Sequence, residues 1–304
     1  MKNIQFRNIT LISFVFLVIT ISGFLVFSWL MNIETDKPSI SIKNEVDKPV
    51  IYFGVIARYS PRKIYQGYQP FMDYLTHNSP YQYELILSRD YNETVEKLIK
   101  GEVDFASLGN YTYINAKKKH DIKCIAKPYN MNGELAFYDN IVVRDTCQFR
   151  DITDFIGKNF AFASEQSFSF WLTKAILLDK GMKLSDLGKY QNFKHHDIVA
   201  EKVIKGEYDI GMIKGLAAKK YIDKGLKIIY TSDPIPGVPI VAAPHIDMQK
   251  YTITQNLLLA IKSDIDSGKL LTNDWDKEIS NGFTTAQDSD YDYSRKIIER
   301  AQSE

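Results

Sequence analysis

The sequence predicts an α/β protein of two similar lobes with mainly parallel sheets, joined by two chain crossovers and preceded by a transmembrane helix. Three observations support this fold class. From residue 50 onward, short apolar runs alternate with amphipathic segments, as in parallel sheets that are covered by helices. A ten-residue pattern at 97–106 recurs at 202–211. A long uncharged run lies near the start of the chain.

The overall charge excludes one large class of function. The 304 residues include 38 Lys and Arg against 37 Asp and Glu. Nucleic-acid-binding proteins usually carry a concentrated basic excess, so this balance argues against a nucleic-acid partner. A hydrophobic content of 45% is typical of a globular protein. Two cysteines cannot build a disulfide scaffold or a multi-cysteine metal site, and neither a metal nor a cofactor is expected.

Residues 9–30 form an apolar run inside a stretch that has no charge from Asn8 to Ile33. A helix of about 22 residues crosses a hydrocarbon core of roughly 30 Å. Basic residues precede the run and acidic residues follow it, which places the rest of the chain outside the cytoplasm. The alternative is a cleaved signal peptide, but its apolar region is usually only about 7–15 residues long. We therefore predict that residues 1–33 are an uncleaved membrane anchor.

The predicted elements of the first lobe alternate in type. Residues 34–49 are polar, contain two prolines and are predicted to be a linker. The elements that follow are a strand at 50–56, a helix at 64–77, a strand at 83–87, a helix at 91–100 and a strand at 103–107. Gly101 ends the second helix, as glycine commonly does.

The repeated pattern indicates that one α/β unit was used twice. KLIKGEVDFA at 97–106 recurs as KVIKGEYDIG at 202–211, and each copy contains a helix end, a Gly stop, an acidic turn and a buried strand. The offset of about 105 residues is too long for a solenoid repeat. The alternative is coincidence, because this arrangement is common in α/β proteins. Asp104 and Asp209 are predicted to cap turns rather than to form a catalytic pair.

Two segments are long enough to cross between the lobes, at 135–144 and 228–241. Only helical patterns follow the second crossing, and we expect those helices to pack on the first lobe. Two lobes with two crossings enclose a cleft that closes around a ligand. The predicted bounds are 50–138 with 235–304 for the first lobe, and 139–234 for the second.

Candidate binding residues lie at two helix starts. Ser167 and Ser169 open a helix predicted at 168–180, where free N–H groups, hydroxyls and the positive end of the helix dipole suit an anion. The alternative is N-capping by one serine. Asn110 and Tyr113 occupy the matching place in the first lobe, where the alternative for the tyrosine is packing against the sheet.

The sequence lacks most enzyme signatures, including glycine-rich nucleotide-binding, nucleophile-elbow and zinc-protease motifs. His196 lies in a His-His-Asp cluster that suggests a metal or catalytic site, but Asp197 is better interpreted as a helix N-cap. Cys124 and Cys147 are expected to be buried thiols, with a disulfide as the alternative. No catalytic function is therefore predicted.

Taken in order, several segments resemble the phosphate/phosphite/phosphonate-binding subunits of bacterial ABC importers. They are GEVDFASLG at 101–109 followed by Tyr113 and Ala116, GKNFAF at 157–162, SFS at 167–169, HD at 196–197, YDIG at 208–211 and PIP at 234–236. The resemblance covers about residues 50–245. It implies the type II periplasmic binding-protein fold, in agreement with the two predicted lobes.

In that family, a hydroxyl-rich turn at the second-lobe helix start holds the phosphonate oxygens, helped by a tyrosine and a histidine. The resemblance therefore implies a ligand role for Ser167, Ser169, Tyr113 and His196; Asn110, Phe168 and Tyr59 complete the candidate set. The family usually has Ser-Thr-Ser-Gly where this chain has SFSF at 167–170, and Gly-Pro where it has Gly109 and Asn110. Relative to that family pattern, the two phenyl rings replace a hydroxyl and a small residue, and they are expected to narrow the pocket or to block it.

We therefore expect a periplasmic solute-binding protein, anchored on the outer face of the bacterial cell membrane by residues 9–30. It would capture a small anion (phosphonate, phosphite or phosphate-like) for the permease of an ABC importer, as a monomer. The alternative is a ligand-sensing module of the same fold that acts through a membrane signalling partner. In either case, helix N-termini and hydroxyls rather than salt bridges are expected to neutralise the anion.

Overall fold

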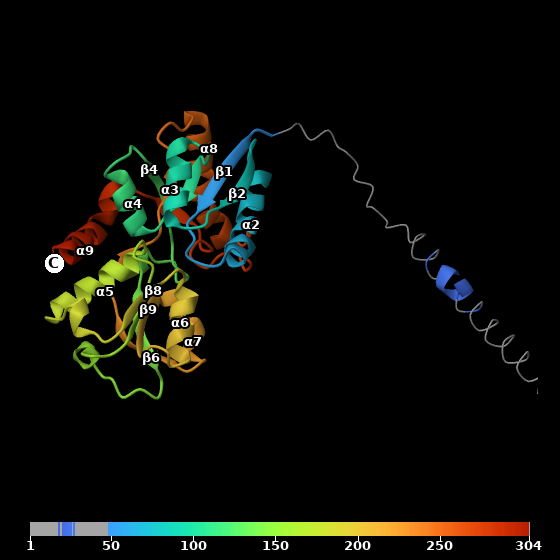
Figure 1. Ribbon diagram of the computed structural model, residues 1–304. Helices are drawn as coiled ribbons and strands as arrows, with labels where there is room; N and C mark the ends of the chain where they lie inside the picture. Colours follow the sequence, from blue (N-terminus) through green and yellow to red (C-terminus); the bar gives the residue numbers. More distant parts are fainter. Residues whose placement is uncertain (1–17, 19, 26, 28–47, 304) are drawn as a thin grey trace, which may run out of the picture. The chain divides into compact units, whose positions relative to one another are not determined.

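The computed structural model describes residues 18, 20–25, 27 and 48–303 (Figure 1). The chain divides into two compact units, residues 1–47 and 48–304. The described residues of the first unit are helical. Most of the expected membrane segment at 9–30 and of the expected linker at 34–49 lies outside the described residues. Within the described part of the chain, no helix is both long enough and apolar enough to span a lipid bilayer.

The second unit contains two lobes, and the first lobe is built on a six-stranded sheet of order β13-β4-β12-β3-β1-β2. Its strands are β1 (Val50–Val55), β2 (Gln82–Leu87), β3 (Phe105–Ser107), β4 (Lys123–Pro128), β12 (Ile240–Ala242) and β13 (Phe283–Thr285). The helices that cover this sheet are α2 (Pro61–His77), α3 (Tyr91–Lys100), α4 (Asn110–Lys117) and α8 (Met248–Asp266).

The second lobe has a five-stranded sheet of order β10-β6-β9-β7-β8. Its strands are β6 (Asp139–Arg144), β7 (Phe160–Ala163), β8 (Tyr190–Phe193), β9 (Ile210–Lys214) and β10 (Leu226–Thr231). The helices of this lobe are α5 (Phe168–Asp179), α6 (His196–Ile204) and α7 (Gly215–Ile222). Short 3-10 helices occur at Ile152–Phe155, Leu184–Asp186 and Asp288–Tyr291.

The chain crosses between the lobes at β5 (Ala136–Phe137) and β11 (Ile235–Pro236). These two short strands pair antiparallel with each other, and each lies inside one of the segments expected to cross. The two crossings therefore lie side by side, so the chain connects the two lobes at a single location.

The expectation of mainly parallel sheets is wrong, because both sheets are mixed. The strands β1 and β7 pair parallel with their neighbours. The strands β6 and β12 pair antiparallel with theirs. Each of them is the first strand of its sheet after a crossing. It therefore enters the sheet from the opposite lobe and runs against most of the other strands. The short edge strand β13 was also not predicted.

The two copies of the repeated pattern have the same local structure. The glycine of each copy has a φ of 74°, in the left-handed region that glycine tolerates best. Asp104 Oδ2 accepts the amide N–H of Tyr52 at 2.8 Å, and Asp209 Oδ2 accepts that of Asn159 at 3.0 Å. Both carboxylates therefore make structural contacts, but with the backbone of a distant segment and not with the turn that the sequence predicted each would cap.

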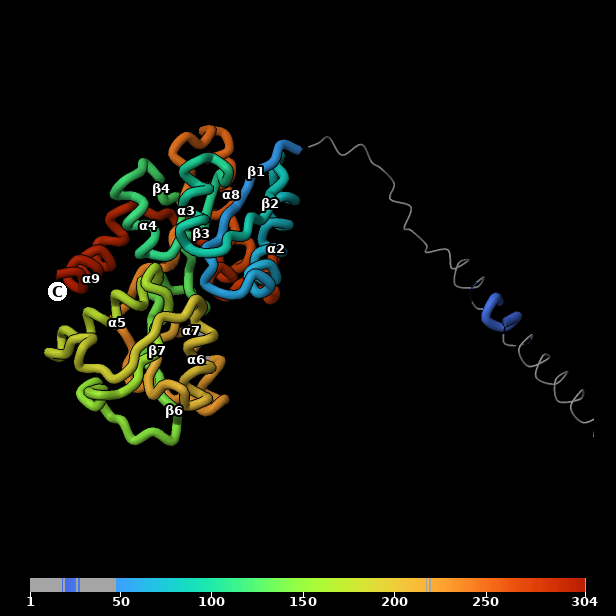
Figure 2. Tube along the Cα trace, viewed as in Figure 1, coloured from blue at the N-terminus to red at the C-terminus, as the bar shows by residue number. Residues whose placement is uncertain are grey.

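The last helix, α9 (Asp292–Gln302), contacts both lobes. It packs against α5 of the second lobe and α4 of the first, at the junction of the lobes (Figure 2). Its buried residue Ile298 belongs to one apolar core that includes residues of both lobes. The C-terminal helices were expected to pack on the first lobe, and α9 contacts the second lobe as well.

Candidate functional site

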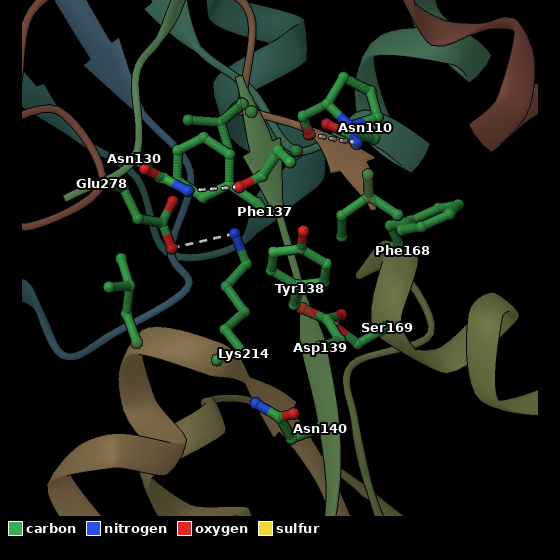
Figure 3. Close-up of a pocket in the computed structure, with 18 of the residues that line it drawn as sticks. Asn110, Asn130, Phe137, Tyr138, Asp139, Asn140, Phe168, Ser169, Lys214 and Glu278 are labelled. Carbon is green, nitrogen blue, oxygen red and sulfur yellow. Dashed lines mark hydrogen bonds and ion pairs between the residues drawn. The ribbon is translucent and has the colours of Figure 1, made fainter. Parts of the chain in front are cut away.

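A cavity of about 310 Å³ lies between the two lobes (Figure 3). Its walls include the start of α5, the end of β9, the loop after β1 and both crossing strands. The volume falls in the range of small-molecule sites rather than of single-ion sites.

The start of α5 contributes two serine hydroxyls that already have protein partners. Ser167 is the N-cap, and its Oγ accepts the N–H of Ser169 at 3.4 Å. The same oxygen lies 3.4 Å from Nε2 of His196. Ser169 Oγ donates to Asp139 Oδ2 at 2.5 Å, and Figure 3 shows these two side chains against each other. Capping and cavity lining are thus both roles of Ser167.

His196 lies behind Ser167 and does not line the cavity. Burial, followed by the positive charge of Lys214, lowers the pKa of His196 to about 3. The imidazole is therefore neutral at pH 7 and orients the Ser167 hydroxyl instead of supplying a charge to a ligand.

Arg58 brings a buried positive charge to the cavity. Only 1% of the residue is exposed, and its Nη2 donates to the hydroxyl of Tyr68 at 2.8 Å. Nη2 also lies 3.4 Å from Asp276 and 3.5 Å from Glu278. Burial tends to lower the pKa of Arg58, but Glu278, Tyr68 and Asp276 raise it well above its usual value. Nε and Nη1 of Arg58 are buried without a hydrogen-bond partner among the residues that the structure describes.

An ion pair joins the lobes across the cavity. Lys214, at the end of β9, lies 3.0 Å from Oε1 of Glu278, which belongs to the first lobe (Figure 3). Burial tends to raise the pKa of Glu278, but Arg58 and Lys214 together lower it to about 2. Glu278 is therefore ionised at neutral pH and shared between two cations.

Asp139, the first residue of β6, is a second buried carboxyl group in the wall. Burial raises the pKa of Asp139, while Lys214 and the hydrogen bond from Ser169 act in the opposite direction. The next residue, Asn140, accepts the hydroxyl of Thr231 through Oδ1 at 2.8 Å. Polar side chains of the wall, such as Asp139 and Asn140, are thus hydrogen-bonded to other lining residues.

Four of the seven predicted ligand residues line the cavity, namely Asn110, Ser167, Phe168 and Ser169. Tyr113 does not, because its hydroxyl donates to Asp288 at 2.7 Å and its ring packs on Tyr291. Tyr59 does not line it either, since its ring lies under the ammonium group of Lys63 at 3.5 Å.

The structure also decides two further sequence predictions, one on the N-cap of α6 and one on the two cysteines. His195 rather than Asp197 is the N-cap of α6, and the carboxylate of Asp197 instead pairs with Lys63 at 3.2 Å. Cys124 and Cys147 are both free thiols, so the disulfide alternative is wrong, and both are half-buried rather than buried as expected.

Sequence reasoning missed the charged residues of the cavity. Arg58 follows the buried strand β1, and Lys214 is the last residue of the buried strand β9. Ligands of α/β proteins commonly bind at the carboxyl ends of strands, so the positions of these two residues could have been predicted as ligand contacts. Glu278 lies in a segment between α8 and β13 that has no regular pattern. The expectation that helix N-termini and hydroxyls, rather than salt bridges, would neutralise an anion did not include the cations and carboxylates that line this cavity.

Two α/β lobes, paired crossings and a cavity between the lobes define a two-lobed ligand-binding protein. Solved structures share this fold. The binding-protein component of an ABC phosphonate transporter from Pseudomonas aeruginosa matches with a TM-score of 0.74 and 17% identity, over 84% of this chain and 87% of that one. PhnD1 from Prochlorococcus marinus in complex with methylphosphonate has the same TM-score of 0.74 with 15% identity, over 84% of this chain and 100% of that one.

The family assignment is also specific. Residues 53–291 match the model of the family described as ABC transporter, phosphonate, periplasmic substrate-binding protein, and the chain belongs to that family. The phosphate-import protein PhnD of Mycolicibacterium smegmatis is 26% identical over 223 residues, which are 67% of this chain and 68% of the relative. The chain is therefore a substrate-binding component of an ABC importer and not an enzyme, as the sequence predicted.

Proposed function

We propose that the cavity between the lobes holds a phosphonate or a closely related oxyanion for delivery to the permease. The observation that carries this assignment is Arg58, whose buried Nε and Nη1 atoms have no hydrogen-bond partner among the described residues of the chain. Arg58 lines the same cavity as the N-terminus of α5. The unpartnered guanidinium N–H groups of Arg58 and the positive end of the α5 dipole together suit the oxygens of a phosphonate head group.

The ion pairs of the cavity give the ligand a way to bind without a large excess of positive charge. Glu278 is shared between Arg58 and Lys214, so an oxyanion would compete with this carboxylate for both cations. Asp139, with its raised pKa, accepts a proton more readily than an ordinary aspartate. Its neutral form would remove a repulsive charge next to Ser169.

The comparisons support this ligand class. The Prochlorococcus marinus protein was solved with methylphosphonate, and the Mycolicibacterium smegmatis relative is named a phosphate-import protein. Methylphosphonate, phosphite and phosphate are therefore the ligands to test on this chain.

We further propose how the rest of the chain serves this function. Residues 9–30, uncharged and apolar, would anchor the protein on the outer face of the membrane, with residues 34–49 as a tether. The monomer would close by moving residues 50–138 with 235–304 against residues 139–234, about the paired strands β5 and β11. Fractionation of cells that express the full chain, compared with a chain lacking residues 1–33, tests the anchor.

The binding site is tested by calorimetry with methylphosphonate on residues 48–304, which form a compact unit by themselves. Ser167→Ala removes a hydroxyl from the head-group end, and we expect its Kd to rise roughly tenfold or more, as for a hydrogen bond to a charged group. Asp247→Ala is the matched control, since Asp247 caps α8 by accepting the N–H groups of Gln249 and Lys250.

Both variants should lose about 1 kcal/mol of stability, because each loses a helix cap. Only Ser167→Ala should lose affinity. Equal Kd values for the two variants would reduce Ser167 to a cap, and the absence of binding by the unmodified protein would contradict the proposed ligand class.

A further inference from the structure

We infer that the ligand is an organophosphonate whose apolar substituent extends from the buried, charged end of the cavity to its open end. The inference rests on the proposed function, because it requires the phosphonate head group to lie beside Arg58 and the start of α5. It goes further by naming which part of the cavity the rest of the ligand occupies.

The charged and the apolar side chains of the cavity wall differ in how far they are exposed. The charged side chains are inside, since Arg58 is 1% exposed and Asp139 and Glu278 are each 2% exposed. The apolar side chains Met131 and Ile228 line the same cavity but are 47% and 36% exposed. Soluble proteins usually show the opposite arrangement, with charges outside and apolar groups inside. An exposed apolar rim around a cavity is typical of a ligand-binding groove.

The rim is formed by segments that the crossings bring together. Met131 belongs to the turn between β4 and β5, Tyr138 to the first crossing, and Ile228 to β10 of the second lobe. Tyr138 is 39% exposed, and Figure 3 shows its ring inside the group of lining residues between Lys214 and Phe168. Both lobes and the crossing therefore contribute an apolar side chain to the open end.

The wall between the two ends is also apolar. Its apolar members come from the crossings and from two helix starts, and they are Phe137, Phe168, Leu216, Ile235 and Val238. Phe168, Ile235 and Val238 are 5–7% exposed. A substituent that follows this wall would bury its surface against carbon atoms along its length.

The polar side chains near the open end already have partners. Asn130 Nδ2 donates to Glu134 at 2.9 Å and to the carbonyl of Ala136 at 2.7 Å. The hydroxyl of Thr231 donates a hydrogen bond to Oδ1 of Asn140 at 2.8 Å. These groups need no hydrogen bond from a ligand, so the open end does not select a second polar group. Asn132 also lines the cavity, and its side chain is exposed to solvent.

A series of straight-chain phosphonates tests the inference on residues 48–304. Calorimetry with methyl-, propyl- and hexylphosphonate should show Kd falling by about fourfold for each methylene that becomes buried. If methylphosphonate binds and the longer compounds bind no better, the apolar end is not a substituent site, and the proposed function stands alone. If none of the three binds, the inference is overturned, and titrations with phosphite and phosphate then decide whether the proposed function also fails.

A rim variant tests whether the gain arises where we place it. Met131→Gln with Ile228→Gln changes two exposed side chains, and we expect it to remove most of the gain in affinity from methyl- to hexylphosphonate. The control is Leu271→Gln, since Leu271 is 77% exposed and does not line the cavity. An unchanged gain in the rim variant would overturn the inference even if hexylphosphonate binds tightly.

Discussion

Three charged side chains, Arg58, Glu278 and Lys214, connect the walls of the cavity. Glu278 lies 3.5 Å from Arg58 and 3.0 Å from Lys214, and Arg58 and Glu278 are almost completely buried. Removing one member of such a network leaves an unpaired buried charge, which typically costs about 3–5 kcal/mol. Ligand contacts at Arg58 are therefore better tested with variants that preserve the charge balance.

His196 gives a prediction about pH. Its pKa is about 3 in the folded protein, against an ordinary value of 6.5. A group with a lowered folded pKa contributes stability above its unfolded pKa and loses it as pH falls, so the unfolding free energy should decrease between pH 7 and pH 5 by about 2 kcal/mol from this group. Urea unfolding at both pH values measures the decrease, and His196→Asn should abolish this part of it.

Other groups titrate both in the unmodified protein and in the His196→Asn variant, so the difference in pH dependence between the two proteins isolates the contribution of His196. Glu278, with its pKa near 2, loses its contribution only at lower pH, below its ordinary value of 4.5. His245→Asn is the control, because His245 is exposed. The same pH dependence in His196→Asn and in the unmodified chain would show that His196 is not held neutral by burial.

At the scale of elements, α9 is the helix that ties the lobes together outside the crossings. Ile298 is fully buried against both the first-lobe and second-lobe parts of one core. Arg300 pairs with Asp179 at the end of α5. This contact lies at the junction and is not part of the cavity wall.

We expect Ile298→Ala to destabilise residues 48–304 by about 2–5 kcal/mol, because it leaves a cavity in the shared core. Urea unfolding measures the loss. Glu299→Ala on the exposed side of the same helix should change the unfolding free energy by less than about 0.5 kcal/mol. Comparable losses in both variants would mean that the helix itself, and not its packing, limits stability.

At the scale of the whole ligand-binding unit, contacts near the cavity hold the two lobes together. The hydroxyl of Thr112 donates to the carbonyl of Gln166 at 3.2 Å, and the rings of Tyr111 and Trp171 stack with centroids 5.0 Å apart. On α2, the ammonium group of Lys63 pairs with Asp197 of α6 at 3.2 Å. These contacts join residues that belong to different lobes, so they should favour the closed form.

Lys63→Met should weaken methylphosphonate binding by up to about fivefold, because a partly exposed ion pair contributes at most about 1 kcal/mol to closure. The effect should diminish at high salt, which screens the pair in the unmodified chain. Lys117→Met removes a pair between the end of α4 and Asp121 in the loop that follows it, both in the first lobe, and serves as the control. Calorimetry at two salt concentrations measures both, and an equal effect of the two variants would argue against a role in closure.

The near-neutral net charge of the chain constrains how the protein can select an anion. A net charge of +1 provides no long-range attraction for an anion. The cavity instead combines Arg58 and Lys214 with carboxylates, so local contacts rather than the overall field would select the ligand.

The sequence alone determined the α/β class, the repeated unit, the crossings and the turn at Ser167 and Ser169. These features depend on local patterns, since periodicity, Gly stops and helix starts are encoded within a few residues. The sequence also carried the family resemblance, because its motifs keep their order along the chain.

Only the tertiary structure decided which side chains reach the cavity. Strand direction in the mixed sheets follows from the crossings, and Tyr113 and His196 turn toward partners that are distant in sequence or belong to another element. Glu278 meets Arg58 and Lys214 only because segments far apart in the chain converge between the lobes. Such contacts depend on burial and on the packing of whole elements, which no local pattern records.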